Sequence, residues 1–106
     1  MSCTCAKART VCKDADESRP IQFIFTDALG GDTIVTYSIE VATIVGVDET
    51  PTTLLDGVAT LNMAKNTVTQ WVHDGVIGNV YSVRCVVMTA DGRELVGAIN
   101  IEVGYA

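Results

Sequence analysis

The sequence of 106 residues is poor in positive charge: it has 7 Lys and Arg against 13 Asp and Glu, a formal net charge of -6. Because phosphate contacts need clustered Lys and Arg, this balance argues against a nucleic-acid-binding protein. It also disfavours binding to an anionic membrane surface. No apolar run approaches the roughly 20 residues that a membrane-spanning helix needs. Nucleic acid and membrane are therefore excluded as expected partners.

The chain also lacks a catalytic signature. Its single histidine, His73, stands beside Asp74 in an expected turn, and no motif places a Ser, Cys or Lys as its nucleophile. Asp27 and Asp32 flank two glycines, but their spacing is not that of the helix–loop–helix calcium motif, so we interpret them as turn residues. We expect no enzymatic activity, no cofactor and no bound metal.

Large apolar side chains are almost absent from residues 1–19, which contain Cys3, Cys5, Cys12 and four basic residues. Such a stretch cannot bury enough surface to fold alone. We therefore expect residues 1–19 to form a flexible arm that is ordered only against a partner. The first residues also lack the apolar segment of a signal peptide, so we expect synthesis in a cytoplasm and exit only within a larger assembly.

Three uses of Cys3, Cys5 and Cys12 remain open. Structural zinc needs four ligands, usually with Cys-x2-4-Cys spacing, and only His73 and Cys85 elsewhere in the chain would complete such a set. Disulfides between subunits are the better use, because a mobile arm brings sulfur atoms into bonding geometry once an assembly leaves the reducing cytoplasm. The third interpretation is a tail that carries incidental free thiols.

In contrast, β-strand patterning is abundant, and it is clearest in residues 78–103. Two β-rich runs are joined there by Asp91-Gly92, a pair that favours a tight hairpin turn. Apolar and polar side chains alternate along both runs, so each run has one dry face that a second sheet must cover. The dry faces hold Tyr81, Val83, Cys85 and Val87 in the first run, and Leu95, Ile99, Ile101 and Val103 in the second.

Shorter strand candidates precede this hairpin, at residues 21–26, 33–45, 58–62 and 67–72. Turn-forming residues separate them at 27–32, in an exposed loop at 48–56 and in a connector at 63–66. No stretch has a sustained helical period. Seven or so short strands separated by Gly, Asp and Asn turns predict an all-β fold: a single antiparallel β-sandwich domain over residues 20–106.

The order of turns and strands carries a resemblance to a known family. Its residues run from Phe25 through Leu29-Gly30-Gly31-Asp32 to Val41, and from Trp71 through Asp74-Gly75 and Tyr81 to Asp91-Gly92-Arg93. Over about residues 21–103 this order resembles small immunoglobulin-like structural proteins of tailed bacteriophages, which are encoded among the head and neck genes. The resemblance implies an immunoglobulin-like fold for the sandwich.

The resemblance also implies a function. We expect a non-enzymatic virion structural protein, made in the host cytoplasm, that acts by self-association and by docking to capsid, neck or tail proteins. Its expected place is the head-to-tail neck or collar, or the capsid surface as a decoration or cement protein. The alternative is a free-standing carbohydrate- or receptor-binding immunoglobulin-like module. Solution mass separates the two, because the virion protein is expected to form homo-oligomers or to bind particles.

The expected core of the sandwich contains Trp71, Tyr81, Val83, Cys85, Ile99 and Ile101. The resemblance extends to fibronectin-type and bacterial immunoglobulin-like domains, in which a Tyr that enters a late strand holds the preceding loop through its hydroxyl. Tyr81 occupies a comparable place. Cys85 is alone among the cysteines in the expected sandwich, so we predict a buried and inert thiol instead of a disulfide within the sheets.

Overall fold

Strands β6 (Val80–Thr89) and β7 (Glu94–Gly104) form the hairpin that the sequence predicted. In this computed structural model, which describes residues 9–104, the chain reverses at Asp91-Gly92. Gly92 has a φ of 81°, a backbone conformation that favours glycine. The Thr89 N–H donates a hydrogen bond of 2.9 Å to the Arg93 carbonyl oxygen and closes the turn. The hairpin is therefore the centre of the first sheet.

This first sheet has four strands, in the order β1-β7-β6-β3. Strand β3 (Ile34–Val45) is antiparallel to β6, whereas β1 (Arg9–Asp14) is parallel to β7, with Arg9 opposite Ile99 and Asp14 opposite Gly104. The parallel pair differs from the all-antiparallel arrangement that the sequence predicted. It arises because the chain lays β1 on the far edge of β7 and only then crosses to the other sheet.

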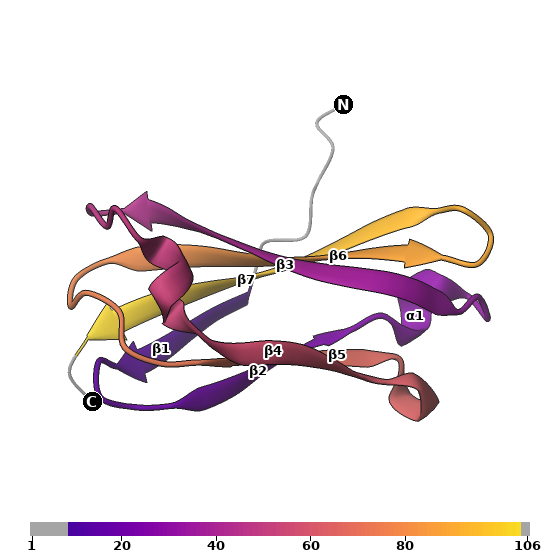
Figure 1. Cartoon of the computed structure of the whole chain (residues 1–106), viewed down its shortest axis with the longest axis horizontal. Helices are drawn as coiled ribbons and strands as arrows, with labels where there is room; N and C mark the ends of the chain where they lie inside the picture. The colour runs from indigo at the N-terminus through magenta and orange to yellow at the C-terminus, as the bar shows by residue number, and fades with distance from the viewer. Residues whose placement is uncertain (1–8, 105–106) are drawn as a thin grey trace.

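The second sheet has three antiparallel strands, in the order β2-β5-β4. They are β2 (Arg19–Ile24), β5 (Thr67–Val72) and β4 (Leu55–Asn62). Figure 1 shows the two sheets as stacked layers, with β3, β6 and β7 above β2, β4 and β5. The chain is thus an all-β sandwich, as predicted.

Three short helical turns lie in the connections: α1 (Thr26–Leu29), η1 (Pro51–Leu54) and η2 (Met63–Lys65). Leu29 and Leu54 are buried there, at 0% and 1% exposure. The predicted loop at 48–56 is therefore not exposed throughout, because η1 turns Leu54 into the core. Within residues 9–104, no helix has the length and apolar character needed to cross a membrane.

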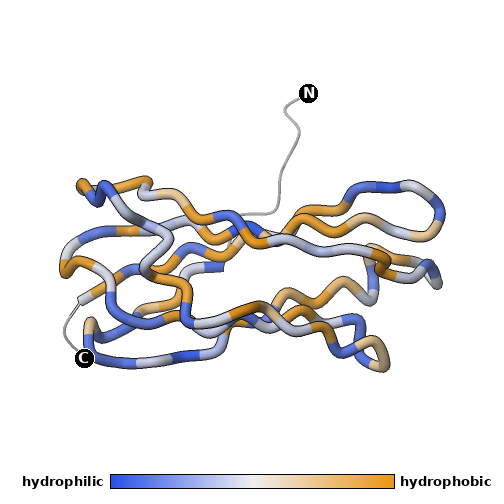
Figure 2. Tube along the Cα trace, in the orientation of Figure 1, coloured by the Kyte–Doolittle hydropathy of each residue, from blue (hydrophilic) through white to orange (hydrophobic). Residues whose placement is uncertain are grey.

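The core lies between the two sheets, and Figure 2 shows hydrophobic and hydrophilic positions alternating along the strands that enclose it. Tyr81, Val83, Cys85, Ile99 and Ile101, which the sequence placed in the core, are 0–4% exposed. They face apolar side chains of the three-stranded sheet, among them Ile21, Phe23, Val68 and Val72.

Trp71 is an exception to the predicted core, because its side chain is 47% exposed. In β5 the inward positions are Val68, Gln70 and Val72, all buried. Trp71 has the opposite parity, so it lies on the outer face of the three-stranded sheet.

The predicted arm also needs correction, because residues 9–14 form β1 and β2 begins at Arg19. This segment is held by backbone pairing with β7, and its buried side chain at Lys13 is polar, so apolar content was the wrong criterion. Residues 1–8, with Cys3 and Cys5, lie outside the described residues.

Replacing Ile99 with Ala tests the inward face of β7. Ile99 is 4% exposed, and we expect the substitution to lower the free energy of unfolding by about 2–5 kcal/mol. Val96, in the same strand, is 46% exposed, so Val96→Ala is the matched control, with an expected change within about 0.5 kcal/mol. Denaturant unfolding measures both. Equal losses in the two variants would mean that the inward face is misassigned.

Candidate docking surfaces

Tyr81 ties together the connections at one end of the sandwich. Its side chain is fully buried at the start of β6. The hydroxyl accepts a hydrogen bond of 3.0 Å from the Val76 N–H and donates one of 2.8 Å to Asp48 Oδ2. Val76 belongs to the connection between β5 and β6, and Asp48 belongs to the connection between β3 and β4. One hydroxyl thus holds two loops against the core.

The pKa values of the Tyr81 hydroxyl and the Asp48 carboxyl are shifted in opposite directions. Burial raises the pKa of the Tyr81 hydroxyl. Hydrogen bonds from the Thr50 backbone N–H and the Tyr81 hydroxyl lower the pKa of the Asp48 carboxyl. Near neutral pH the phenol is therefore protonated and the carboxyl ionised, as a donor and acceptor that hold one another in place.

Two more buried polar side chains complete the same end. Asn79 Nδ2 donates a hydrogen bond of 3.0 Å to the Val47 carbonyl oxygen. Lys13, only 2% exposed, donates from Nζ to the carbonyl oxygens of Asp14 (2.7 Å) and Asp74 (2.6 Å). Burial lowers the pKa of the Lys13 ammonium, and the Asp74 carboxylate opposes this shift. The end of β1, the connection between β3 and β4 and the connection between β5 and β6 thus form one hydrogen-bonded unit.

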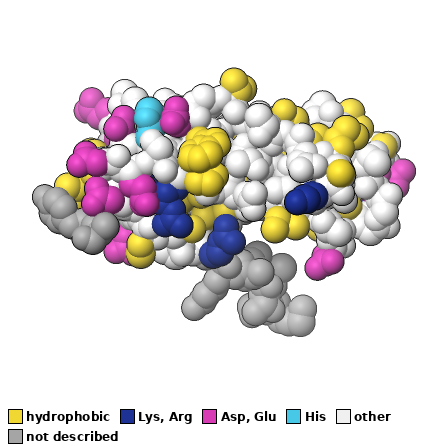
Figure 3. Space-filling view, turned by 90° about the horizontal axis from the view of Figure 1, so that it is seen from below, with side chains coloured by type: hydrophobic (Ala, Val, Ile, Leu, Met, Phe, Trp, Pro, Cys, Tyr) yellow, Lys and Arg dark blue, Asp and Glu magenta, His cyan; other side chains and the backbone are white. Residues whose placement is uncertain are grey.

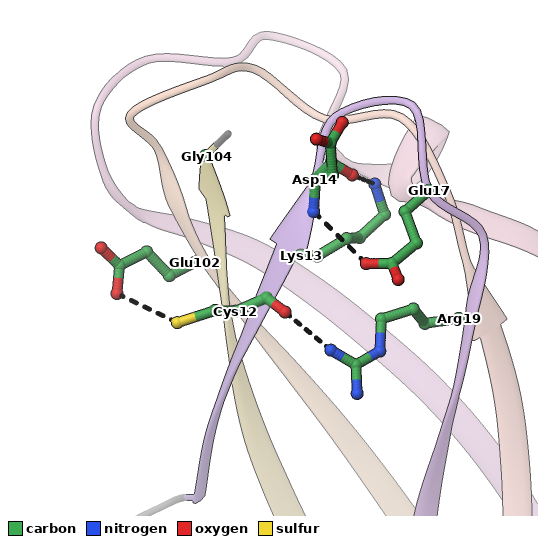
Figure 4. Close-up of a pocket in the computed structure, with 7 residues that line it drawn as sticks. All are labelled: Cys12, Lys13, Asp14, Glu17, Arg19, Glu102 and Gly104. Atoms are coloured by element: carbon green, nitrogen blue, oxygen red, sulfur yellow. Dashed lines mark hydrogen bonds between the residues drawn. The ribbon is translucent and has the colours of Figure 1, made fainter. Parts of the chain in front are cut away.

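A polar pocket of about 390 Å³ lies beside this unit, where β1, β2 and β7 approach one another (Figure 4). Arg19 Nη1 donates a hydrogen bond of 2.7 Å to the Cys12 carbonyl oxygen, and Cys12 Sγ lies 4.0 Å from Glu102 Oε2. The charged groups are of mixed sign, and among the described residues neither an imidazole nor a second thiol lines the pocket. Its lining is Cys12, Lys13, Asp14, Glu17, Arg19, Glu102 and Gly104.

The other side of the sandwich, between the edge strands β3 and β4, is open. Because four strands pack over three, the inward side chains of β3 are only partly covered: Tyr37 is 37% exposed, and Ile39 and Val41 are half-buried. A groove of about 440 Å³ separates the two edges, and none of the described residues that line it is charged. We call this groove the open flank; it is lined by Tyr37, Ser38, Ile39, Leu55, Gly57, Val58, Ala59 and Gln70.

The open flank owes its shape to a bulge in β4, which leaves the ladder with β5 between Asp56 and Thr60. Gly57 has a φ of 77° within this bulge. The buried Gln70 donates from Nε2 to the Gly57 carbonyl oxygen at 3.1 Å, so the displaced backbone keeps a hydrogen bond. Val58 is left 90% exposed at the rim.

Exposed apolar side chains gather along β3, β4 and the connection between them. Edge strands also present unpaired backbone N–H and C=O groups to an incoming chain. Tyr37 and Val58 line the groove beside these edges, so the open flank is the strongest candidate docking surface. The exposed residues, at 37–90%, are Val35, Tyr37, Ile44, Val45, Val47 and Val58.

The outer face of the three-stranded sheet is a second candidate. Trp71 is exposed there and lies opposite Pro20 on β2 and Asp56 on β4. Figure 3 looks onto this side and shows hydrophobic side chains near the middle of the face, with acidic side chains gathered at one end. Trp is enriched among the residues that dominate protein interfaces, which makes Trp71 a candidate anchor.

The other candidate groups from the sequence do not combine into a reactive site. His73 Nδ1 lies 3.7 Å from Asp74 Oδ2 at the surface. The Asp32 carboxyl receives a hydrogen bond of 3.1 Å from Arg93 Nη2, and contacts with Thr89, Thr33 and Arg93 lower its pKa. Within residues 9–104, no group of three or more His, Cys, Asp or Glu is placed to hold a metal ion.

The two described cysteines differ in exposure. Cys85 is buried, and burial raises the pKa of its thiol to about 12. Cys12 is exposed, and neither of the two is in a disulfide. Cys3 and Cys5 lie outside the described residues, so inter-subunit disulfides through Cys3, Cys5 and Cys12 stay a prediction.

Sequence reasoning missed Lys13, Asp48 and Gln70. A signal existed for Gln70, because it alternates with Val68 and Val72 and therefore has inward parity. Lys13 alternates in the same way with Val11, but it lay in the stretch interpreted as an arm. Asp48 carries no local signal, because its partner Tyr81 is 33 positions away.

A β-sandwich with an apolar groove between two edge strands has the form of a structural domain that docks to other proteins. A family model described as podophage GP4 fiber-tail adaptor protein gp77 matches residues 13–102. The chain belongs to this family, and it is therefore a structural component of a phage particle. No curated protein matches the chain.

Replacing Tyr81 with Phe tests how much the two hydrogen bonds of its hydroxyl stabilise the fold. The substitution leaves the Val76 N–H and the Asp48 carboxylate without their partner, and we expect a loss of about 1–3 kcal/mol in the free energy of unfolding at pH 7. Tyr37→Phe is the control, because its exposed hydroxyl makes one long contact, 3.4 Å to the Ala59 carbonyl oxygen. Denaturant unfolding measures both variants.

The difference in the free energy of unfolding between the parent and Tyr81→Phe should also depend on pH. The pKa of Asp48 in the folded state is below its ordinary value of 3.8, so its stabilising contribution is present above about pH 4 and is lost as the pH falls through the lowered pKa. The difference between the parent and Tyr81→Phe should therefore shrink on acidification. A difference that stays constant from pH 7 down to the lowest pH at which both proteins remain folded would contradict the assigned contact.

Proposed function

We propose that the protein is a non-enzymatic, immunoglobulin-like adaptor that joins a fibre to the tail of a podophage by docking to both. The observation that carries the proposal is the family match over residues 13–102, which covers nearly the whole sandwich. The family description names a fibre and a tail. This favours a position at the tail, near the head-to-tail neck or collar, over decoration of the capsid surface.

The strand order supports the immunoglobulin-like part of the proposal. An immunoglobulin constant domain has strands A, B, E and D in one sheet and C, F and G in the other. In the same notation β2, β5 and β4 correspond to B, E and D, and β3, β6 and β7 correspond to C, F and G. The departure is β1, which pairs with the last strand instead of with β2. The Tyr81 hydroxyl on the loop before β6 agrees with this assignment.

Two separate surfaces suit an adaptor, which has to hold two partners at once. The open flank offers an apolar groove between two edge strands, a form that accepts an added β-strand from a partner. Trp71 lies on a different face, outside the three-stranded sheet. The net charge of -6 favours partner surfaces that are basic. Self-association around the tail axis, through the remaining edges, is part of the same proposal.

A phage with an amber codon in this gene tests the proposed function. On a non-suppressing host we expect particles that have heads and tails but lack fibres, as seen by electron microscopy and by the protein composition of purified particles. A plasmid copy of the parent gene should restore the fibres. Particles with the usual number of fibres but without this chain would contradict the adaptor function.

Complementation with single variants separates the function from the surface assigned to it. Val58→Glu places a charge at the rim of the open flank without disturbing a buried contact, and it should restore few fibres. Val96→Glu, on the outer face of the first sheet, is the control and should restore them fully. If both variants restore fibres, the adaptor function stands and the open flank is the wrong surface.

The alternative function is a carbohydrate- or receptor-binding module, and the exposed Trp71 is the observation that favours it. Aromatic side chains on a flat polar face can stack against sugar rings. In the amber experiment this alternative predicts fibred particles that fail to adsorb to cells, an outcome that the adaptor proposal does not allow.

A further inference from the structure

Two connections at one end of the sandwich expose apolar side chains. Val47 lies between β3 and β4 and is 81% exposed, whereas Val76 and Ile77 lie between β5 and β6 and are 47% and 44% exposed. Figure 1 shows both connections at the same end of the molecule, opposite the turn of the β6–β7 hairpin. We call Val47, Val76 and Ile77 the apolar tip. None of the three lines the open flank, so the apolar tip is a separate surface.

Hydrogen bonds tie the two connections together. Asn79 Nδ2 donates a hydrogen bond of 3.0 Å to the Val47 carbonyl oxygen, and the Tyr81 hydroxyl bonds to both connections. Gly46, with a φ of 90°, lies so close to Asn79 that a Cβ at this position would clash with the side-chain amide. The apolar tip is therefore held in place before any partner arrives, and a surface of this kind loses little conformational freedom on binding.

Residues 76–79 form a tight turn that does not account for its own sequence. The Asn79 N–H donates a hydrogen bond of 3.0 Å to the Val76 carbonyl oxygen, and Gly78 has a φ of 91° at the third position. Glycine is what this position requires, but the second position, held by Ile77, favours Pro and has no need of a large apolar side chain. Ile77 does not belong to the core either. A side chain that neither the turn nor the core explains points to a contact outside this chain.

Acidic side chains are concentrated at the same end, in the turn after β1 and in the two connections that hold the apolar tip. They are Asp14, Asp16, Glu17, Asp48, Glu49 and Asp74. The basic side chains nearest to them in the sequence are engaged within the chain. Lys13 is buried with Nζ on backbone carbonyl oxygens, and Arg19 donates to the Cys12 carbonyl oxygen. This end therefore presents negative charge to solvent, and Figure 3 shows acidic side chains gathered there.

The charge determines which partner the apolar tip fits. An apolar surface with a negative rim complements an apolar pocket whose rim carries Lys and Arg. A second copy of this chain is a poor match, because its net charge is -6 and its exposed Arg84 and Arg93 are already paired with carboxylates of the same chain. An anionic membrane is disfavoured by the same negative charge. The partner is therefore a different protein.

We propose that the apolar tip inserts into an apolar, basic-rimmed pocket on another protein of the phage particle. Val47 and Ile77 supply apolar contact from the two connections, and the exposed Glu49 and Asp74 supply the negative rim. The proposal requires only that the chain is a component of the particle. It does not depend on the adaptor function or on the open flank.

Photo-crosslinking in assembled particles tests the proposal. A phage that lacks this gene is grown with a plasmid copy of the full chain that carries Ile77→p-benzoyl-phenylalanine. Irradiation should join the chain to another particle protein, and peptide mass should map the attachment to an apolar segment flanked by Lys or Arg. Met63→p-benzoyl-phenylalanine is the matched control and should not give this adduct, because Met63 is 64% exposed in the connection between β4 and β5, at the opposite end of the sandwich (Figure 1).

Charge variants give an independent reading. With the photoreactive group kept at position 77, Glu49→Lys should lower the yield of the adduct roughly tenfold, because it sets like charges against one another across the interface. Glu94→Lys is the control and should leave the yield unchanged, because this exposed carboxylate stands beside the hairpin turn at the far end. Both purified variants should unfold at the same denaturant concentration as the parent, which separates lost docking from lost folding.

A third variant covers the case in which the photoreactive group itself blocks docking. Ile77→Asp should lower the number of copies of this chain in purified particles, whereas Met63→Asp should not. Three results would overturn the proposal. They are an adduct that joins two copies of this chain, an adduct yield that is the same in Glu49→Lys as in the parent, and the absence of an adduct together with full incorporation of Ile77→Asp.

Discussion

Four strands pack over three, and this mismatch decides which parts of the sandwich are covered. The buried rows of β6 and β7 lie over the three-stranded sheet, whereas β3 extends past its edge. The bulge in β4 widens the gap, and Gln70 keeps the displaced backbone hydrogen-bonded. The open flank is therefore a consequence of how the core is built. Its exposed apolar side chains are those that a strand from a partner would cover.

The end of the sandwich that holds the β3–β4 and β5–β6 connections, the loop end, is closed by hydrogen bonds instead of being left open. There the backbone of three connections is satisfied by buried polar side chains, with Tyr81 and Asn79 holding two loops and Lys13 joining β1 to the loop before β6. Removing one member would leave a partly buried partner group without this hydrogen bond. The loop end is thus held by hydrogen bonds, whereas the open flank leaves apolar side chains exposed.

The local pattern of the sequence was sufficient for the strands that alternate strictly. Residues 67–72 and the hairpin around Asp91-Gly92 were predicted because period 2 and turn chemistry act over short distances. Trp71 was misplaced because its size suggested burial, while its parity in β5 indicated the outer face. β1 was missed because its stability comes from pairing with β7, about 90 positions away, and from Lys13 donating to the Asp74 carbonyl oxygen. The open flank depends on the number of strands in each sheet, which no single stretch encodes.

The central claim is that this sandwich links a fibre to the tail through the open flank. A single-particle electron microscopy map of the fibred tail tests it most directly. The account predicts one sandwich at each fibre attachment point, with density of a partner strand seated between β3 and β4. A map in which the sandwich lies on the capsid surface, or in which the open flank faces solvent at the attachment point, would contradict it.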